Sequence, residues 1–287
     1  MNLVPGYVET LHDNLQIFLE HWGPIDWRGR IEQVRQQDRP EMAVLLAGLS
    51  GIEDDSFYMQ NKLKHSGSAR LDPVRQFNSV WLVEEADHGR ALAALARKYT
   101  GDASLPSSFD HSTFHRDRRS IVAVPALRAT SLYRRGALAA YFALGTTVEY
   151  IAVTTYKALA RTLDDEIARD ILMQMSSQEG RHMRFYRKGA IAVMSGSVVC
   201  QRFVREVLEK YWRPPGVDLF GYDRWVRIFR PLLQDNAVQE GYLRLDEICG
   251  GLPGLSGIEI MKPFMARCAR SLEAGVDPRL IPSSGVE

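Results

Sequence analysis

The helical periodicity of this chain, interrupted by ionisable residues at matching points, is the feature that most constrains its fold. Four long segments, 40–65, 73–99, 131–161 and 164–193, repeat apolar residues at alternating spacings of three and four, which places them on one face of a helix. Near its middle each apolar stripe contains a glutamate, alone in two segments and inside a Glu-x-x-His motif in the other two. These interrupting residues are Glu53, Glu85, His88, Glu149, Glu179 and His182. All six are therefore expected to face the protein core.

The Glu-x-x-His spacing has little value by itself, because short motifs of common residues arise by chance. A third copy, Glu9 and His12, lies near the N-terminus without a matching helix, and we expect it to be a solvated turn. Among the other acidic residues, Glu84 and Asp87 lie off the apolar stripe and are predicted to be solvated too. Asp54 and Asp55 adjoin Glu53 and are alternatives to it if the helix has a different phase.

Buried carboxylates need a counter-charge. An ionised carboxylate in a protein core costs several kcal/mol unless it is paired, and four converging ones repel one another. A buried Glu–Arg network is one solution, but none of the four stripes contains Arg or Lys. A lone Glu on each of two helices and a Glu-x-x-His motif on each of two others is the ligand set that holds two metal ions inside a four-helix bundle. Carboxylates with one imidazole per ion suit iron, with manganese as the alternative.

The pattern of helical segments along the rest of the chain predicts an all-α protein of one domain, residues 1–287. We expect a core bundle at about 40–195, with additional helices before it and at about 196–287. Asp72 before Pro73 and the pair Asp164 and Asp165 are helix-start signals. Segment 100–130 is predicted to be a long crossover, which gives a ferritin-like layout. Within it, Ile121–Ala126 is limited by Pro125 to an edge strand or a loop.

Composition narrows the functional classes. With 45% hydrophobic and 25% charged residues, the chain of 287 residues can bury a large core, and its formal charge of +1 does not indicate nucleic-acid binding. Three cysteines without metal or disulfide spacing, and no charged-then-apolar start, predict a cytoplasmic protein. Residues 136–156 are long and apolar enough to span a membrane, but we interpret them as the centre of a soluble bundle.

Four stretches resemble the soluble acyl-carrier-protein desaturases, a family of ferritin-like di-iron carboxylate enzymes. Residues 81–89 read Trp-Leu-Val-Glu-Glu-Ala-Asp-His-Gly and are similar to that family's Trp-x-x-Glu-Glu-x-x-His-Gly, while 178–182, Gln-Glu-Gly-Arg-His, are similar to its Asp-Glu-x-Arg-His. Residues 22–27, Trp-Gly-Pro-Ile-Asp-Trp, resemble the stretch before its bundle. Residues 45–48, Leu-Leu-Ala-Gly, followed by Glu53, resemble its first ligand helix. The resemblance covers residues 20–195 and fades afterwards.

This resemblance implies that the six core residues are iron ligands, with Glu85 and Glu179 bridging the two ions. It also implies an O2-dependent desaturase acting on an acyl chain carried on acyl carrier protein, with a ferredoxin-type electron donor and a homodimeric state. Two residues near the metals depart from the family. Gln178 replaces an Asp that helps to relay electrons between a ligand histidine and the residue matching Trp22, and Ala152 replaces a Thr near the oxygen side.

Alternatives therefore stay open. A di-iron hydroxylase or N-oxygenase of a specialised metabolite would keep every ligand, and a non-catalytic ferritin- or rubrerythrin-like iron protein is less favoured because no four-cysteine module is present. A basic docking surface for the acidic carrier is placed at Lys62, Lys64 and Arg70. The residues that could line an apolar substrate channel are Phe57, Trp81, Phe142, Tyr156 and Met175.

Overall fold

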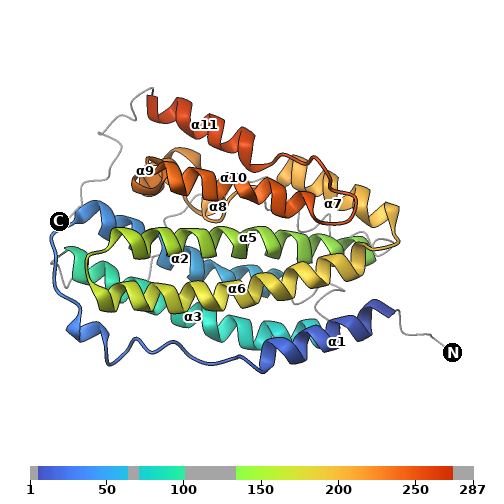
Figure 1. Ribbon diagram of the computed structural model, residues 1–287, viewed down its shortest axis with the longest axis horizontal. Helices are drawn as coiled ribbons and strands as arrows, with labels where there is room; N and C mark the ends of the chain where they lie inside the picture. The colour runs from blue at the N-terminus through green and yellow to red at the C-terminus, as the bar shows by residue number, and fades with distance from the viewer. Residues whose placement is uncertain (1–5, 64–70, 101–133, 274–287) are drawn as a thin grey trace.

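The computed structural model describes residues 6–63, 71–100 and 134–273. Within these ranges the regular elements are ten α-helices and one short 3-10 turn, and none is a strand. Four long helices lie side by side, as Figure 1 shows: α2 (Pro40–Leu63), α3 (Asp72–Thr100), α5 (Arg134–Thr162) and α6 (Glu166–Met194). The predicted all-α bundle with added helices is confirmed, and the predicted segments match these helices to within three residues at either end. The predicted crossover and its edge stretch at 121–126 lie outside the described residues.

The start of α6 shows how the sequence sets a helix boundary. Asp165 has an extended backbone, and its side chain accepts hydrogen bonds from the backbone N–H groups of Ile167 and Ala168. A second oxygen of Asp165 accepts from the backbone N–H of Arg35, so the cap also ties the chain before α2 to the bundle. The carboxylate satisfies donors that the first turn leaves unpaired and lies at the positive end of the helix dipole.

Helices α5 and α6 approach closely because glycines face aromatic rings in both directions. A Cβ atom on Gly145 of α5 would lie 2.2 Å from the ring of Tyr186, and one on Gly189 of α6 would lie 2.5 Å from the ring of Phe142. Neither position therefore has room for a side chain while the rings keep their places. One turn after Gly145 comes Glu149, so this contact brings the lone glutamate of α5 against α6.

Seven further elements surround the bundle. Helix α1 (Gly6–Leu19) packs on α6 and α3, and the 3-10 turn η1 (Ile31–Gln33) contacts α3 and α6. Helices α7 (Val198–Tyr211), α8 (Val217–Phe220), α9 (Tyr222–Leu233), α10 (Asn236–Gly250) and α11 (Met261–Glu273) lie along the α5 side of the bundle in Figure 1. Helix α10 packs on α5 and α9 packs on α2. Both faces of the bundle centre thus carry additional helices.

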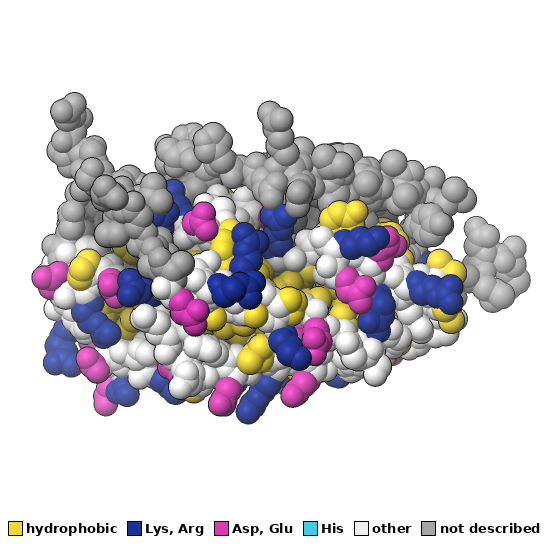
Figure 2. Space-filling model, turned by 90° about the horizontal axis from the view of Figure 1, so that it is seen from above, with side chains coloured by type: hydrophobic (Ala, Val, Ile, Leu, Met, Phe, Trp, Pro, Cys, Tyr) yellow, Lys and Arg dark blue, Asp and Glu magenta, His cyan; other side chains and the backbone are white. Residues whose placement is uncertain are grey.

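The face of the molecule on the α11 side carries a mixture of basic, acidic and apolar side chains. Figure 2 shows Lys and Arg side chains interspersed with Asp and Glu and with apolar groups, and no single-sign patch forms among the described residues of this face. The predicted basic docking surface at Lys62, Lys64 and Arg70 lies outside the side chains that the structure describes. It stays a prediction.

Helix α5 is the apolar segment that length and composition alone would allow to cross a membrane. Of its most apolar window, 56% is buried inside the protein. The core helix of a soluble bundle passes the same test, so the membrane-free state stays a prediction. The three cysteines, Cys200, Cys249 and Cys268, are free and buried, as small apolar core residues often are.

Candidate metal centre

The six glutamates and histidines predicted from the apolar stripes lie together in the middle of the bundle. Helix α2 contributes Glu53, α5 contributes Glu149, and α3 and α6 each contribute a Glu-x-x-His pair. None is more than 6% exposed. They form two overlapping groups in which one ligand atom from each residue lies within 4.8 Å of the others. The His88 half contains Glu53, Glu85, His88 and Glu179, and the His182 half contains Glu85, Glu149, Glu179 and His182.

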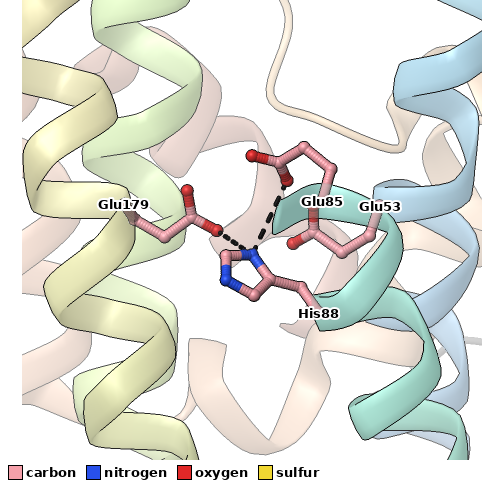
Figure 3. Close-up of side chains that lie close together, drawn as sticks. All are labelled: Glu53, Glu85, His88 and Glu179. Atoms are coloured by element: carbon pink, nitrogen blue, oxygen red, sulfur yellow. Dashed lines mark ion pairs between the residues drawn. The ribbon is translucent and has the colours of Figure 1, made fainter. Parts of the chain in front are cut away.

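Both imidazoles turn Nδ1 towards the carboxylates. The Nδ1 atom of His88 lies 3.0 Å from Glu179 Oε1 and 3.7 Å from Glu85 Oε2, as the dashed lines in Figure 3 show. The Nδ1 atom of His182 lies 2.8 Å from Glu179 Oε2 and 3.1 Å from Glu85 Oε1. Glu85 and Glu179 are thus the two carboxylates shared by the halves. They occupy the positions at which a carboxylate can bridge two ions.

Three atoms of this cluster are close to partners but make no hydrogen bond. They are Glu85 Oε1, Glu179 Oε1 and His88 Nδ1, and all three are buried. A buried polar atom without a partner costs roughly 1–3 kcal/mol, so three in one cluster need a physical reason. A cation among them would satisfy all three, and four carboxylates with two imidazoles suit two iron or manganese ions. The residues present therefore fit the predicted pair of metals.

Without a metal, the four carboxyl groups of the cluster are of two kinds, which differ in the direction of their pKa shifts. Burial raises the pKa of Glu53 well above its ordinary value, and the neighbouring charge of Glu85 raises it further. Burial and the charge of Glu179 do the same to the pKa of Glu149. The pKa values of Glu85 and Glu179 are lowered in spite of burial. For Glu85, the contacts with Glu53 and with the two imidazoles outweigh burial. For Glu179, the charge of His88 and the contacts with the two imidazoles do so.

The histidines complete the charge balance. Burial lowers the pKa of His88, but the nearby charges of Glu179 and Glu85 outweigh burial and raise that pKa to about 10. The pKa of His182 is also raised well above its ordinary value, because hydrogen bonds to glutamates outweigh burial. Four carboxylates, two neutral imidazoles and two divalent ions sum to zero charge, so two such ions could replace bound protons without burying net charge.

The prediction that Glu84 and Asp87 are solvated was wrong. Glu84 is only 3% exposed: its Oε2 accepts from His182 Nε2 at 2.7 Å, and its Oε1 pairs with Arg181 at 2.7 Å. Asp87 is buried and pairs with Arg28. Counting positions round one helix locates the stripe that faces the bundle, but α6 and the segment after α1 cover the flank of α3 as well. Arg181, within the Glu-Gly-Arg-His motif, is the sequence feature that could have predicted a buried carboxylate nearby, because it pairs with Glu84.

Gln178 lies next to the cluster, as predicted. Its Oε1 accepts from His88 Nε2 at 2.5 Å, and its Nε2 donates to the backbone oxygen of Gly23 at 2.5 Å. Gln178 therefore contacts residues 22–27 through the backbone of Gly23 and not through the side chain of Trp22, which is 48% exposed. Ala152 is half-buried against the core. The roles given to Gln178, Trp22 and Ala152 stay predictions.

Two residues predicted as channel lining have polar contacts with the cluster. Trp81 Nε1 donates to Glu149 Oε1 at 3.1 Å, and the Tyr156 hydroxyl donates to Glu53 Oε1. Each lone glutamate thus has one neutral donor that holds it in place. The sequence signal for these polar contacts is that Trp81 and Tyr156 lie on the same helix stripes as the ligands. Trp81, for example, lies one turn before the α3 motif. The other described members of that set, Phe142 and Met175, are fully buried, and the side chain of Phe57 lies outside the described ones.

The structure also settles the phase of α2 around its acidic run. Glu53, and neither of the aspartates after it, belongs to the group with the α3 and α6 ligands. Asp54 instead lies beside Gly89, where a Cβ atom would come within 2.9 Å of its Oδ1. The glycine after the α3 motif therefore allows α2 and α3 to pack closely next to the cluster.

Fold and site together define an all-helical protein with a buried carboxylate–histidine cluster that could hold two metal ions. A scan against protein-family models, a search of curated proteins and a search of solved structures found no match to this chain.

Proposed function

We propose that this protein is a di-iron, O2-dependent oxidase. The observation that carries the proposal is the cluster of four buried carboxylates and two imidazole Nδ1 atoms, with Glu85 and Glu179 shared between the halves. Two ferrous ions bound there would supply the two-electron activation of O2 that protein side chains cannot provide. Manganese is the alternative metal, because the same oxygen and nitrogen ligands suit it.

The protein's own residues would set geometry and access. The indole of Trp81 and the hydroxyl of Tyr156 orient the two unshared glutamates, and Glu84 and Gln178 orient the two imidazoles. Hydrogen-bonded outer residues of this kind fix the ligand tautomer and ring orientation. The complete burial of both imidazoles keeps bulk water away from the ligand atoms.

The proposed reaction is the desaturation of an acyl chain carried on acyl carrier protein. Its support is the motif resemblance over residues 20–195, and the fully buried Phe142 and Met175 agree with apolar surroundings for the cluster. A ferredoxin-type donor would deliver the electrons, and we propose a cytoplasmic homodimer without membrane or nucleic-acid contact. Lys62, Lys64 and Arg70 are the proposed docking residues for the acidic carrier.

A second candidate is a di-iron hydroxylase or N-oxygenase of a specialised metabolite. The specific observation is Gln178: a neutral amide, where the desaturases have an acid, contacts the imidazole of His88. Outer residues change reactivity while leaving metal binding intact, so this contact and Ala152 favour a different outcome for the same metal pair.

One experiment separates these functions. The iron-loaded protein is incubated with a reductant, O2 and either acyl carrier proteins that bear acyl chains of graded length or candidate amine substrates. The carriers and amines are then analysed by mass spectrometry. Loss of two hydrogen atoms supports desaturation, and gain of one oxygen atom supports hydroxylation. Iron uptake with no O2-dependent change in any carrier or amine substrate contradicts the oxidase and supports an iron-storage protein. Protein that binds no iron or manganese contradicts a metal centre altogether.

A further inference from the structure

The two histidines of the cluster have chemically different partners on their outer nitrogens. His88 Nε2 donates to a neutral amide oxygen, Gln178 Oε1, at 2.5 Å. His182 Nε2 donates to a carboxylate oxygen, Glu84 Oε2, at 2.7 Å. The two partners also touch each other, because Gln178 Nε2 donates to Glu84 Oε1 at 3.2 Å. A single chain of hydrogen bonds thus joins the imidazoles on the side away from the shared carboxylates.

This difference matters for metal binding. Both partners accept the N–H of Nε2, so both imidazoles keep a lone pair on Nδ1 when neutral. A hydrogen bond to a carboxylate is stronger than one to an amide and makes the imidazole the better electron donor. Arg181 pairs with Glu84 Oε1 at 2.7 Å and leaves Oε2 for His182. Changes to such outer partners alter metal affinity by about 10–100-fold.

The remaining ligands do not offset this difference. The halves share Glu85 and Glu179, and each has one further glutamate. The unshared Glu53 and Glu149 each accept a hydrogen bond from one neutral donor, a phenol and an indole respectively. All six ligands are buried. The outer partners of the two histidines are therefore the clearest chemical difference between the halves.

We propose that the two halves bind metal with unequal affinity and fill in order, the His182 half first and the His88 half second. Glu84 is then a positioning residue that sets the order, and Gln178 is its weaker counterpart. The inference rests on the proposed metal centre but is independent of the reaction that the metals support.

The test is a titration of the metal-free protein with Mn2+, followed by calorimetry and electron paramagnetic resonance. We expect two binding steps. At one Mn2+ per chain the spectrum should be that of an isolated ion, and at two per chain it should weaken as the ions couple. Glu84→Gln gives both imidazoles an amide partner, so its first step should weaken by about 10–100-fold and merge with the second.

Two further variants make the result specific. Gln178→Ala removes the partner of His88 and one of the hydrogen bonds to Glu84, so it should weaken the second step more than the first. Asp87→Asn is the matched control: it neutralises another buried carboxylate on α3, which pairs with Arg28 and touches neither histidine. Both binding steps should survive it.

The outcomes are distinguishable. If the wild type binds no Mn2+, the metal centre itself is contradicted and this inference falls with it. If the wild type binds two ions in equal steps, only the unequal halves are overturned. An unchanged first step in Glu84→Gln, or a first step that weakens more than the second in Gln178→Ala, also overturns the assigned order. Should Glu84→Gln not fold, the Gln178→Ala titration decides alone.

Discussion

The Glu-x-x-His copies on α1 and α6 share a spacing and differ in their surroundings. On α1, Glu9 and His12 lie on the solvent side of a helix whose other face, with Leu11 and Leu15, is in the core. On α6, Glu179 and His182 are fully buried and face three more glutamates. The spacing places two side chains on one helix face in both cases. Only on α6 does burial create an electrostatic demand that metal ions can meet.

Removing one carboxylate from each copy should give the largest contrast. Because Glu179 belongs to both halves, we expect Glu179→Ala to lose both ions, from about two per chain to none. Glu9→Ala, the matched control, should keep the wild-type metal content. The measurement is metal analysis after gel filtration, and equal metal content in the two variants would contradict the proposed centre.

Lowering the pH should weaken metal binding at the α6 copy. His88 has its pKa raised to about 10 and holds a proton below that value, and the raised pKa values of His182, Glu53 and Glu149 mean that metal must displace those protons too. We therefore expect the affinity to fall by at least about tenfold per pH unit on acidification below neutral pH.

Calorimetry in buffers of different ionisation enthalpy measures this effect directly. Proton release on metal binding is expected, because the pKa values of both imidazoles and of the two unshared carboxyl groups are raised. An affinity that does not change with pH, with no proton release, would contradict the protonation pattern.

Weakening the close contact between α5 and α6 should move Glu149 away from the Glu-x-x-His copy on α6. That copy would then lack a full set of ligands, as the copy on α1 does. Gly145→Ala places a Cβ atom 2.2 Å from the Tyr186 ring, so we expect a loss of about 1–3 kcal/mol in unfolding free energy and weaker metal binding through Glu149. Gly180→Ala on α6 is the control, because a Cβ there meets nothing within 4 Å. It should stabilise the protein by up to about 1 kcal/mol. Denaturant unfolding that ranks the two variants equally would show that the close approach is unimportant.

The smallest expected effect is at the start of α6. Asp165→Ala removes the side chain that caps Ile167 and Ala168, and we expect it to lower the unfolding free energy by about 1 kcal/mol. Asp164→Ala is the control, since the side chain of Asp164 is 85% exposed. Thermal unfolding of the metal-free proteins should show a lower midpoint for the first variant only. A similar midpoint in both would mean that the cap contributes little.

The stripes were sufficient to predict the four helices and five of the cluster residues, because a spacing of three and four residues defines a helix face without reference to the rest of the fold. They favoured Glu53 as the sixth, and the structure decided between it and the neighbouring Asp54 and Asp55. They failed for Glu84 and Asp87, whose burial comes from α6 and from the segment after α1. They also missed the hydrogen bonds of Trp81 and Tyr156, which were predicted only as apolar surfaces. Such contacts depend on how neighbouring helices are placed, and one helix's periodicity carries no information about that.

The sequence by itself thus determined which residues on each helix face the core, since helix geometry is local. The tertiary structure decided which groups are paired: the amide of Gln178 accepts from His88, and the carboxylate of Glu84 accepts from His182. It also decided that Gly145 lies against Tyr186 where α5 and α6 meet. Those pairings join residues that lie about 90 or more positions apart in Gln178–His88 and Glu84–His182. Relative helix placement alone brings them within hydrogen-bond distance, and it thereby gives two motifs of equal spacing unequal chemistry.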